Sequence, residues 1–296
     1  MEPHPELERY AELDAAGFLP GVGEAAADFE SRIAAIREAH RQFEEELSAN
    51  GEVKVFQEFL LKESERIPAE IIAEADDLTG ELYDFRTVHV PGFFLSRDVG
   101  LLWGGCMISD TELPFSFFLI RGAFRKRQKW FLYNRKELLA HELCHSMRQP
   151  LRDVPLEEFF AYRTSPSRFR RYLGNCFIRD YDALLFVIPV FILLGAVIVQ
   201  SFLLPALPAW PFWILALAYP AYLLYRNARA RHWVFKAAKT LKRFGVEKPM
   251  AVLFRSTTPE IRELGKLKSP ESLWAYVDGK QELRWQIIRR RFLPNL

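Results

Sequence analysis

The segment from Asn134 to Met147 carries two histidines and a glutamate at a spacing that can hold a metal ion. Its central letters, His-Glu-Leu-Cys-His, place His141, Glu142 and His145 within five residues. On an α-helix, residues four apart share one face, so the two imidazoles can converge on one ion while Glu142 flanks them. A glutamate in this place can act as a general base toward water. The spacing therefore predicts a metal-dependent hydrolase, if the segment is helical.

The residues around this motif favour a helix. Asn134 is suited to the N-cap position and Glu137, three residues later, completes a pair resembling a capping box. Leu139 and Leu143 fall opposite the histidines and give the helix a face to bury. Pro150 follows closely and predicts that the helix ends before it.

A third metal ligand is expected from the next helix. Catalytic zinc commonly takes three protein ligands and keeps one position open for water. Pro155 suits the first turn of a new helix, which carries Glu157 and Glu158. We favour Glu158, because Ala161 lies on the same helix face and would let two helices approach closely. Glu157 remains an alternative, and both acids could instead complement the helix dipole.

The His-Glu-Leu-Cys-His segment, together with Glu158-Phe159-Phe160-Ala161, resembles the HExxH zinc metallopeptidases of the gluzincin type, including membrane-embedded members. The resemblance implies a zincin-like fold, a Zn²⁺ cofactor held by His141, His145 and Glu158, and Glu142 as the catalytic base. The chain departs from that pattern after Ala161. Members usually carry an acid at the next position, whereas here it is Tyr162.

Short aromatic or β-branched segments before the motif predict a small sheet. They are Gly92–Leu95, Phe115–Ile120 and Lys129–Tyr133. A basic turn joins the last two, so we expect a hairpin whose second strand leads into the metal-binding helix. By the same resemblance, a peptide substrate is expected to pair with Phe115–Ile120 by strand addition. Further upstream, Glu24–Asn50 predicts a long polar helix.

Two uncharged stretches after the motif indicate a membrane hairpin. Ala183–Leu204 has no charged residue and is long enough to cross about 30 Å of hydrocarbon. Ala209–Tyr225 is shorter, contains two prolines and is rich in the tryptophan and tyrosine typical of membrane interfaces. The alternative is a pair of buried helices in a soluble protein. The length of the first uncharged stretch argues against it.

Basic residues flank this hairpin on both sides, whereas the link between its two halves has none. The distribution of positive charge predicts that both flanks are cytoplasmic. The flanks can also contact anionic lipid headgroups. An acidic N-terminus without a following apolar stretch gives no indication of a signal peptide. Three cysteines form no disulfide framework, and Cys144 is expected to be a small buried residue.

The composition fits this organisation. Half of the 296 residues are apolar and 26% are charged, and the net charge of +2 gives no reason to expect a nucleic-acid partner. We expect an α+β fold in four regions: N-terminal helices (1–80), a zincin-like core (81–180), a transmembrane hairpin (181–226) and C-terminal cytosolic helices (227–296). The predicted function is a membrane-anchored zinc metallopeptidase acting on peptides or proteins. The alternatives are a catalytically silent membrane scaffold and a zinc hydrolase of another amide.

Overall fold

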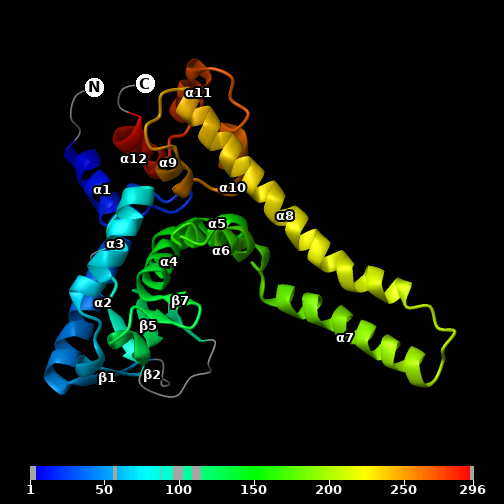
Figure 1. Cartoon of the computed structure of the whole chain (residues 1–296). Coiled ribbons are helices and arrows are strands. Elements are labelled where there is room, and N and C mark those ends of the chain that lie inside the picture. Colours follow the sequence, from blue (N-terminus) through cyan, green and yellow to red (C-terminus); the bar gives the residue numbers. More distant parts are fainter. Residues whose placement is uncertain (1–4, 56–58, 88, 96–102, 109–114, 294–296) are drawn as a thin grey trace.

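The computed structural model describes residues 5–55, 59–87, 89–95, 103–108 and 115–293, and shows a mostly helical α+β protein with small sheets (Figure 1). The N-terminal helices are α1 (Pro5–Ala15), α2 (Ala26–Asn50) and α3 (Ala69–Tyr83). The central helices are α4 (Arg135–Arg148), α5 (Val154–Tyr162) and α6 (Arg168–Leu173). Two long helices follow, α7 (Asp180–Phe202) and α8 (Trp210–Arg243), and then α9 (Pro249–Phe254), α10 (Thr258–Leu264), α11 (Pro270–Asp278) and α12 (Leu283–Phe292). The long helix predicted upstream is confirmed as α2.

Three small sheets accompany the helices. Strands β1 (Glu52–Val55) and β2 (Phe59–Lys62) form one antiparallel pair, and β6 (Lys129–Trp130) and β7 (Tyr133–Asn134) form another. The third sheet has the order β3 (Gly92–Leu95), β5 (Phe117–Arg121), β4 (Gly105–Ile108). In it, β5 is parallel to β3 and antiparallel to β4.

The expected hairpin between Phe115–Ile120 and Lys129–Tyr133 is wrong. Strand β5 pairs with β3 and β4, while β6 turns back on β7. The reason is that neighbours in a sheet can be distant in sequence. Here β5 is the middle strand, and its first four residues are buried. The second part of the prediction is right, because β7 ends at Asn134 and α4 begins at Arg135.

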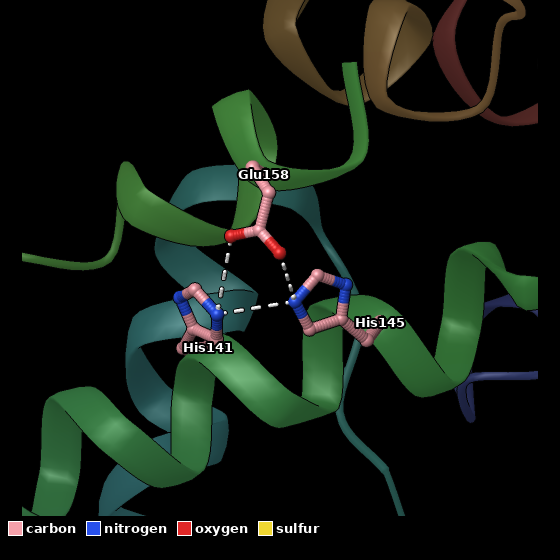
Figure 2. Close-up of side chains that lie close together, drawn as sticks. All are labelled: His141, His145 and Glu158. Atoms are coloured by element: carbon pink, nitrogen blue, oxygen red, sulfur yellow. Dashed lines mark hydrogen bonds and ion pairs between the residues drawn. The ribbon is translucent and has the colours of Figure 1, made fainter. Parts of the chain in front are cut away.

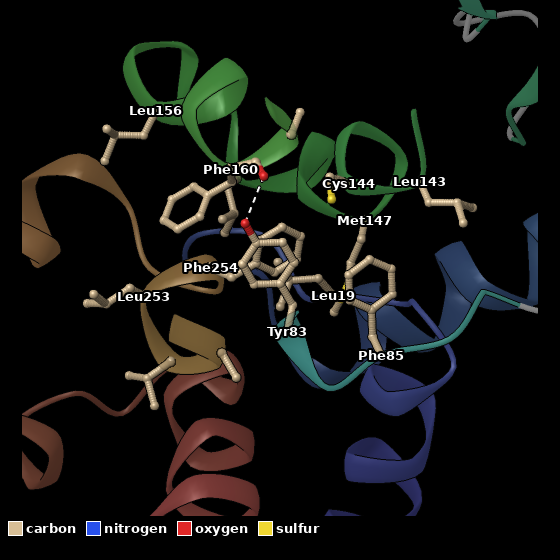
Figure 3. Packing of buried hydrophobic residues seen from close by; sticks show 14 of the residues in the cluster. Leu19, Tyr83, Phe85, Leu143, Cys144, Met147, Leu156, Phe160, Leu253 and Phe254 are labelled. Carbon is tan, nitrogen blue, oxygen red and sulfur yellow. Dashed lines mark hydrogen bonds between the residues drawn. The ribbon is translucent and has the colours of Figure 1, made fainter. Parts of the chain in front are cut away.

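One hydrophobic core joins the metal-motif helices to both ends of the chain. Figure 3 shows Tyr83, from the end of α3, between Phe160 of α5 and Phe254 of α9. The Tyr83 ring stacks on Phe254 with 4.1 Å between centroids, and its hydroxyl donates to Phe160 O at 2.7 Å. Leu143 on α4 and Trp285 on α12 belong to the same buried cluster. The C-terminal helices are therefore part of the structure that supports α4 and α5.

Helices α7 and α8 extend away from this body as an antiparallel pair (Figure 1). Asp182, at the start of α7, is fully buried and accepts from Tyr219 Oη at 2.7 Å and from Arg226 Nη2 at 2.6 Å. Both partners lie on α8. These bonds join the two helices where they leave the body, and we call the pair beyond this point the arm.

The arm corresponds only in part to the predicted membrane hairpin. Among the described residues, Tyr181–Phe202 alone is long and apolar enough to cross a membrane, with 11% of its most apolar window buried in the protein. The second predicted span, Ala209–Tyr225, forms the first half of α8 but does not meet the same measure. Tyrosine, tryptophan and proline make this half less apolar, and the helix continues into a basic half that packs on the body. The structure therefore supports one candidate span and does not show a two-span hairpin.

Candidate metal centre

Helix α4 forms over the motif and begins as its sequence predicts. Asn134 Oδ1 accepts from Lys136 N at 3.0 Å and from Glu137 N at 3.5 Å, which satisfies donors of the first turn. Glu137 does not complete the expected capping box, because its carboxylate instead accepts from Ser165 Oγ and from Arg170 Nη1 at 3.0 Å. This carboxylate therefore joins α4 to the start of α6.

The face of α4 opposite the histidines is buried, as the motif requires. Leu139, Leu143 and Cys144 have no exposed surface, and the helix ends at Arg148, two residues before Pro150. The buried packing of Cys144 agrees with the prediction. Because this face is fixed in the core, the histidines on the other face are held in one orientation.

His141, His145 and Glu158 come together between α4 and α5 (Figure 2). The two Nε2 atoms are 3.1 Å apart, and the two oxygens of Glu158 each lie 3.6 Å from one of them. A tetrahedral site with bonds of about 2.0–2.1 Å separates its ligand atoms by about 3.3–3.4 Å. Two imidazole nitrogens and one carboxylate oxygen are also a donor set typical of metal-dependent hydrolases. The three residues thus form a group that can hold a metal ion.

Glu142 lies beside this group and contacts strand β4. Its Oε2 accepts from Met107 N at 3.1 Å, so the backbone of β4 fixes the carboxylate. Burial raises the pKa of Glu142 to about 7. Burial also holds the pKa of His141 well below its usual range, which keeps the ring neutral as a metal ligand must be.

Glu157 takes a different place from Glu158, which separates the two alternatives for the third ligand. Its Oε1 lies 3.5 Å from Nδ1 of His145, on the side of the ring away from the ligand group. Its Oε2 accepts from Arg148 Nε at 3.1 Å. A carboxylate at the second nitrogen of a ligating histidine fixes the tautomer and orientation of the ring. Glu157 is thus placed to orient His145.

Arg148 connects this support to the C-terminal helices. It is completely buried, and its Nη2 lies 3.0 Å from Asp153 Oδ2 while its Nη1 donates to Phe254 O. Asp153 in turn accepts from Thr258 N at 2.9 Å. The charge of Arg148 is therefore balanced by Asp153 and Glu157, and its position depends on residues more than a hundred positions later.

Tyr162 stands where the resembling family usually has an acid. Its ring meets the His141 ring edge-on, with centroids 4.6 Å apart. The same ring packs closely on Gly174, where an added Cβ would lie 2.1 Å from Tyr162 Cδ2. The expected carboxylate is thus replaced by an aromatic contact at His141, while Glu157 supplies a carboxylate at His145.

The sequence did not reveal Arg148, Asp153, Thr258 or Met107 as parts of the site. An arginine in the last turn of a helix usually complements the helix dipole at the surface. A backbone donor such as Met107 N leaves no trace in the residue types. The adjacent glutamates Glu157 and Glu158 did indicate a supporting carboxylate. Neighbouring residues on a helix point about 100° apart, so the two side chains can contact different partners.

No family model matches this sequence, and no curated protein or solved structure is significantly similar to it.

Proposed function

We propose that this protein is a membrane-anchored, zinc-dependent metallopeptidase. The observation that carries the proposal is the meeting of His141, His145 and Glu158 at distances that suit tetrahedral zinc, with Glu142 alongside. The site fits a hydrolase better than a structural zinc site, because three protein donors leave one coordination position for water.

The residues divide the chemistry of hydrolysis among them. Bound zinc would supply a Lewis acid that activates water and polarises the scissile carbonyl. Glu142 takes the proton of the attacking water and gives it to the departing amine. Met107 N holds the carboxylate in place through the hydrogen bond to Oε2. Glu157 keeps the His145 ring turned toward the ligand group.

A peptide substrate is better placed on β4 than on the strand named from the sequence. Strand β5 has a partner on each side and cannot accept another, so strand addition to Phe115–Ile120 is excluded. Among the described strands, β4 forms the edge beside Glu142. Since Gly104 O accepts from Arg121 N, the alternate residues Gly105 and Met107 direct their backbone groups away from β5. The N–H of Met107 is held by Glu142, so Gly105 and the carbonyl of Met107 are the groups that a peptide would pair with. A peptide pairing there lies next to the proposed base.

The arm is the proposed membrane anchor. Residues before and after it share one core, so a chain that enters the bilayer through α7 must return through the first half of α8. Pairing with α7 supports the shorter, tyrosine-rich half of α8, whose Trp210 and Trp213 suit an interface. The basic residues that flank the arm favour a cytoplasmic position for the body.

The metal centre is tested by zinc content and hydrolysis in the purified protein. The wild-type protein is expected to carry one equivalent of zinc, and Glu142→Gln to keep the metal while hydrolysis of a peptide library falls by about 10²–10⁴-fold. The matched control is Glu70→Gln, an exposed acid on α3, which should change neither property. Wild-type protein without zinc would refute the metal centre and favour a binding scaffold. Full activity of Glu142→Gln would refute its role as the base.

A further inference from the structure

The β6–β7 turn exposes two apolar residues beside a row of basic ones. Phe131 and Leu132 form the two-residue turn and are 61% and 68% exposed. Phe131 has φ +50°, at a turn position where glycine is the usual residue. Packing within the described part of the chain does not require an exposed phenylalanine at a positive φ, so Phe131 is a candidate for contact with another surface. The segment just before them contains Lys126, Arg127 and Lys129, all exposed.

Helix α6 lies against the turn and repeats the same combination. Arg170 Nη1 donates to Leu132 O at 3.3 Å, which joins the two segments. Phe169 is 72% exposed and Tyr172 is also exposed, next to Arg168 and Arg171. Both segments therefore combine aromatic side chains with positive charge, the combination that suits the headgroup region of an anionic bilayer.

The contacts of α6 with α8 give its depth relative to the arm. Asn227 Nδ2 donates to Tyr172 O at 2.6 Å, and Arg231 Nη1 donates to Arg171 O at 2.9 Å. The apolar half of α8 ends at Tyr225. At 1.5 Å per residue along the helix axis, Asn227 lies about 3 Å and Arg231 about 9 Å beyond it. The headgroup layer on each side of the hydrocarbon is about 5–8 Å thick. Figure 1 shows α6 near the base of the arm. An arm that spans the hydrocarbon therefore leaves α6 at headgroup depth.

The apolar surface is also continuous with the arm. Phe177, exposed between α6 and α7, meets Phe186 of α7 edge-on with centroids 5.7 Å apart. We infer that the β6–β7 turn and α6 form a second membrane-contact surface, which binds anionic lipid headgroups and inserts Phe131 and Leu132 among them. This inference rests on the proposed membrane anchor. Because β7 leads directly into α4, the contact fixes the metal-binding helix at the bilayer surface.

The inference is tested with three single-cysteine labels on the full chain in lipid nanodiscs. Leu132→Cys reports on the turn, Phe191→Cys on the exposed surface of α7 and Val22→Cys on the far end of α4, since neighbouring Gly21 lies against Pro150. Each carries a fluorescent maleimide, and labelling of the native cysteines in wild-type protein gives the blank. Nitroxide lipids are expected to quench the labels at positions 132 and 191 but not at 22.

The charge component is tested in the same system. Lys126, Arg127 and Lys129 are replaced by glutamine. The ratio of protein molecules with the β6–β7 turn in the bilayer to those with the turn in water is expected to fall by roughly fivefold for each charge removed. The effect should require phosphatidylserine in the nanodisc. Quenching at position 191 without quenching at 132 would overturn the second contact surface and leave the arm in the membrane. Absence of quenching at both positions would overturn the anchor and this inference together.

Discussion

Two adjacent glutamates lie against different atoms of the histidines, so we expect metal affinity to distinguish their roles. Glu158 faces both Nε2 atoms, whereas Glu157 faces Nδ1 of His145. Glu158→Gln is expected to abolish stoichiometric zinc binding, because it removes a ligand. Glu157→Gln should weaken zinc affinity by about 10–100-fold, the usual effect of losing a carboxylate behind a ligating histidine. Competition with a chelator measures both, and the reverse order of effects would make Glu157 the ligand.

Asp76 on α3 is a buried carboxyl whose ionisation should make the stability of the protein depend on pH. Burial raises its pKa to about 6 from the ordinary value of 3.8, although its Oδ1 accepts from Thr87 N at 2.8 Å. Between these values the folded state binds more protons than the unfolded state, so ionisation of Asp76 lowers stability as the pH rises. Asp76→Asn keeps the acceptor and should stabilise the protein at pH 7 by up to about 3 kcal/mol.

The measurement for Asp76 is thermal melting in detergent at several pH values. The gain of the asparagine variant should disappear below about pH 4, where the wild-type carboxyl is protonated in both states. Asp77→Asn is the matched control, because that neighbour is largely exposed and pairs with Arg86 at the surface. A gain that does not depend on pH would show that ionisation of Asp76 is not its cause.

At the scale of elements, the contact between α5 and the segment before α7 depends on one glycine. An alanine at position 174 would overlap the Tyr162 ring, which also contacts His141. Gly174→Ala should therefore cost about 1–3 kcal/mol of stability and weaken metal binding. Melting and zinc titration measure the two effects. Gly195→Ala is the control, because nothing lies near its Cβ and alanine favours a helix.

The double variant Gly174→Ala with Tyr162→Ala makes this test specific. If the clash with the ring causes the loss, removing the ring should relieve most of the cost added by the alanine at position 174, so the two changes will not be additive. Additive losses would mean that Gly174 matters for another reason, such as the backbone of its own turn.

Local sequence signals predict some elements of this fold, whereas contacts between distant parts of the chain are not predicted. Helix α4 was predictable because its signals are local: a cap at Asn134, buried leucines at helical spacing and Pro150 beyond the end. The partner of β5 was not, because β3 and β4 approach it from separate parts of the chain. The ligand group was predictable from residue types. The support of Glu157 by Arg148 was not, since it depends on packing with α9.

At the scale of the molecule, the contacts that support the candidate metal site come from the C-terminal helices rather than from the arm. Arg148 reaches Phe254 O, Asp153 accepts from Thr258, and the buried pair of Arg255 with Asp14 joins α9 to α1. A chain ending at Lys248 loses these contacts and much of the core. It should therefore fail to bind zinc and should melt without a cooperative transition, as expected when a buried charge such as Asp14 loses a partner.

The matched deletion removes the arm instead. Replacing residues 184–218 with a short flexible linker leaves the bonds of Asp182 to Tyr219 and Arg226 in place, since these lie where the arm meets the body. This protein should bind zinc with wild-type affinity and lose only its attachment to lipid. Zinc titration and flotation with vesicles measure the two properties. If removal of the arm abolished zinc binding while truncation at Lys248 preserved it, the core shared by both ends of the chain would not be what holds the site.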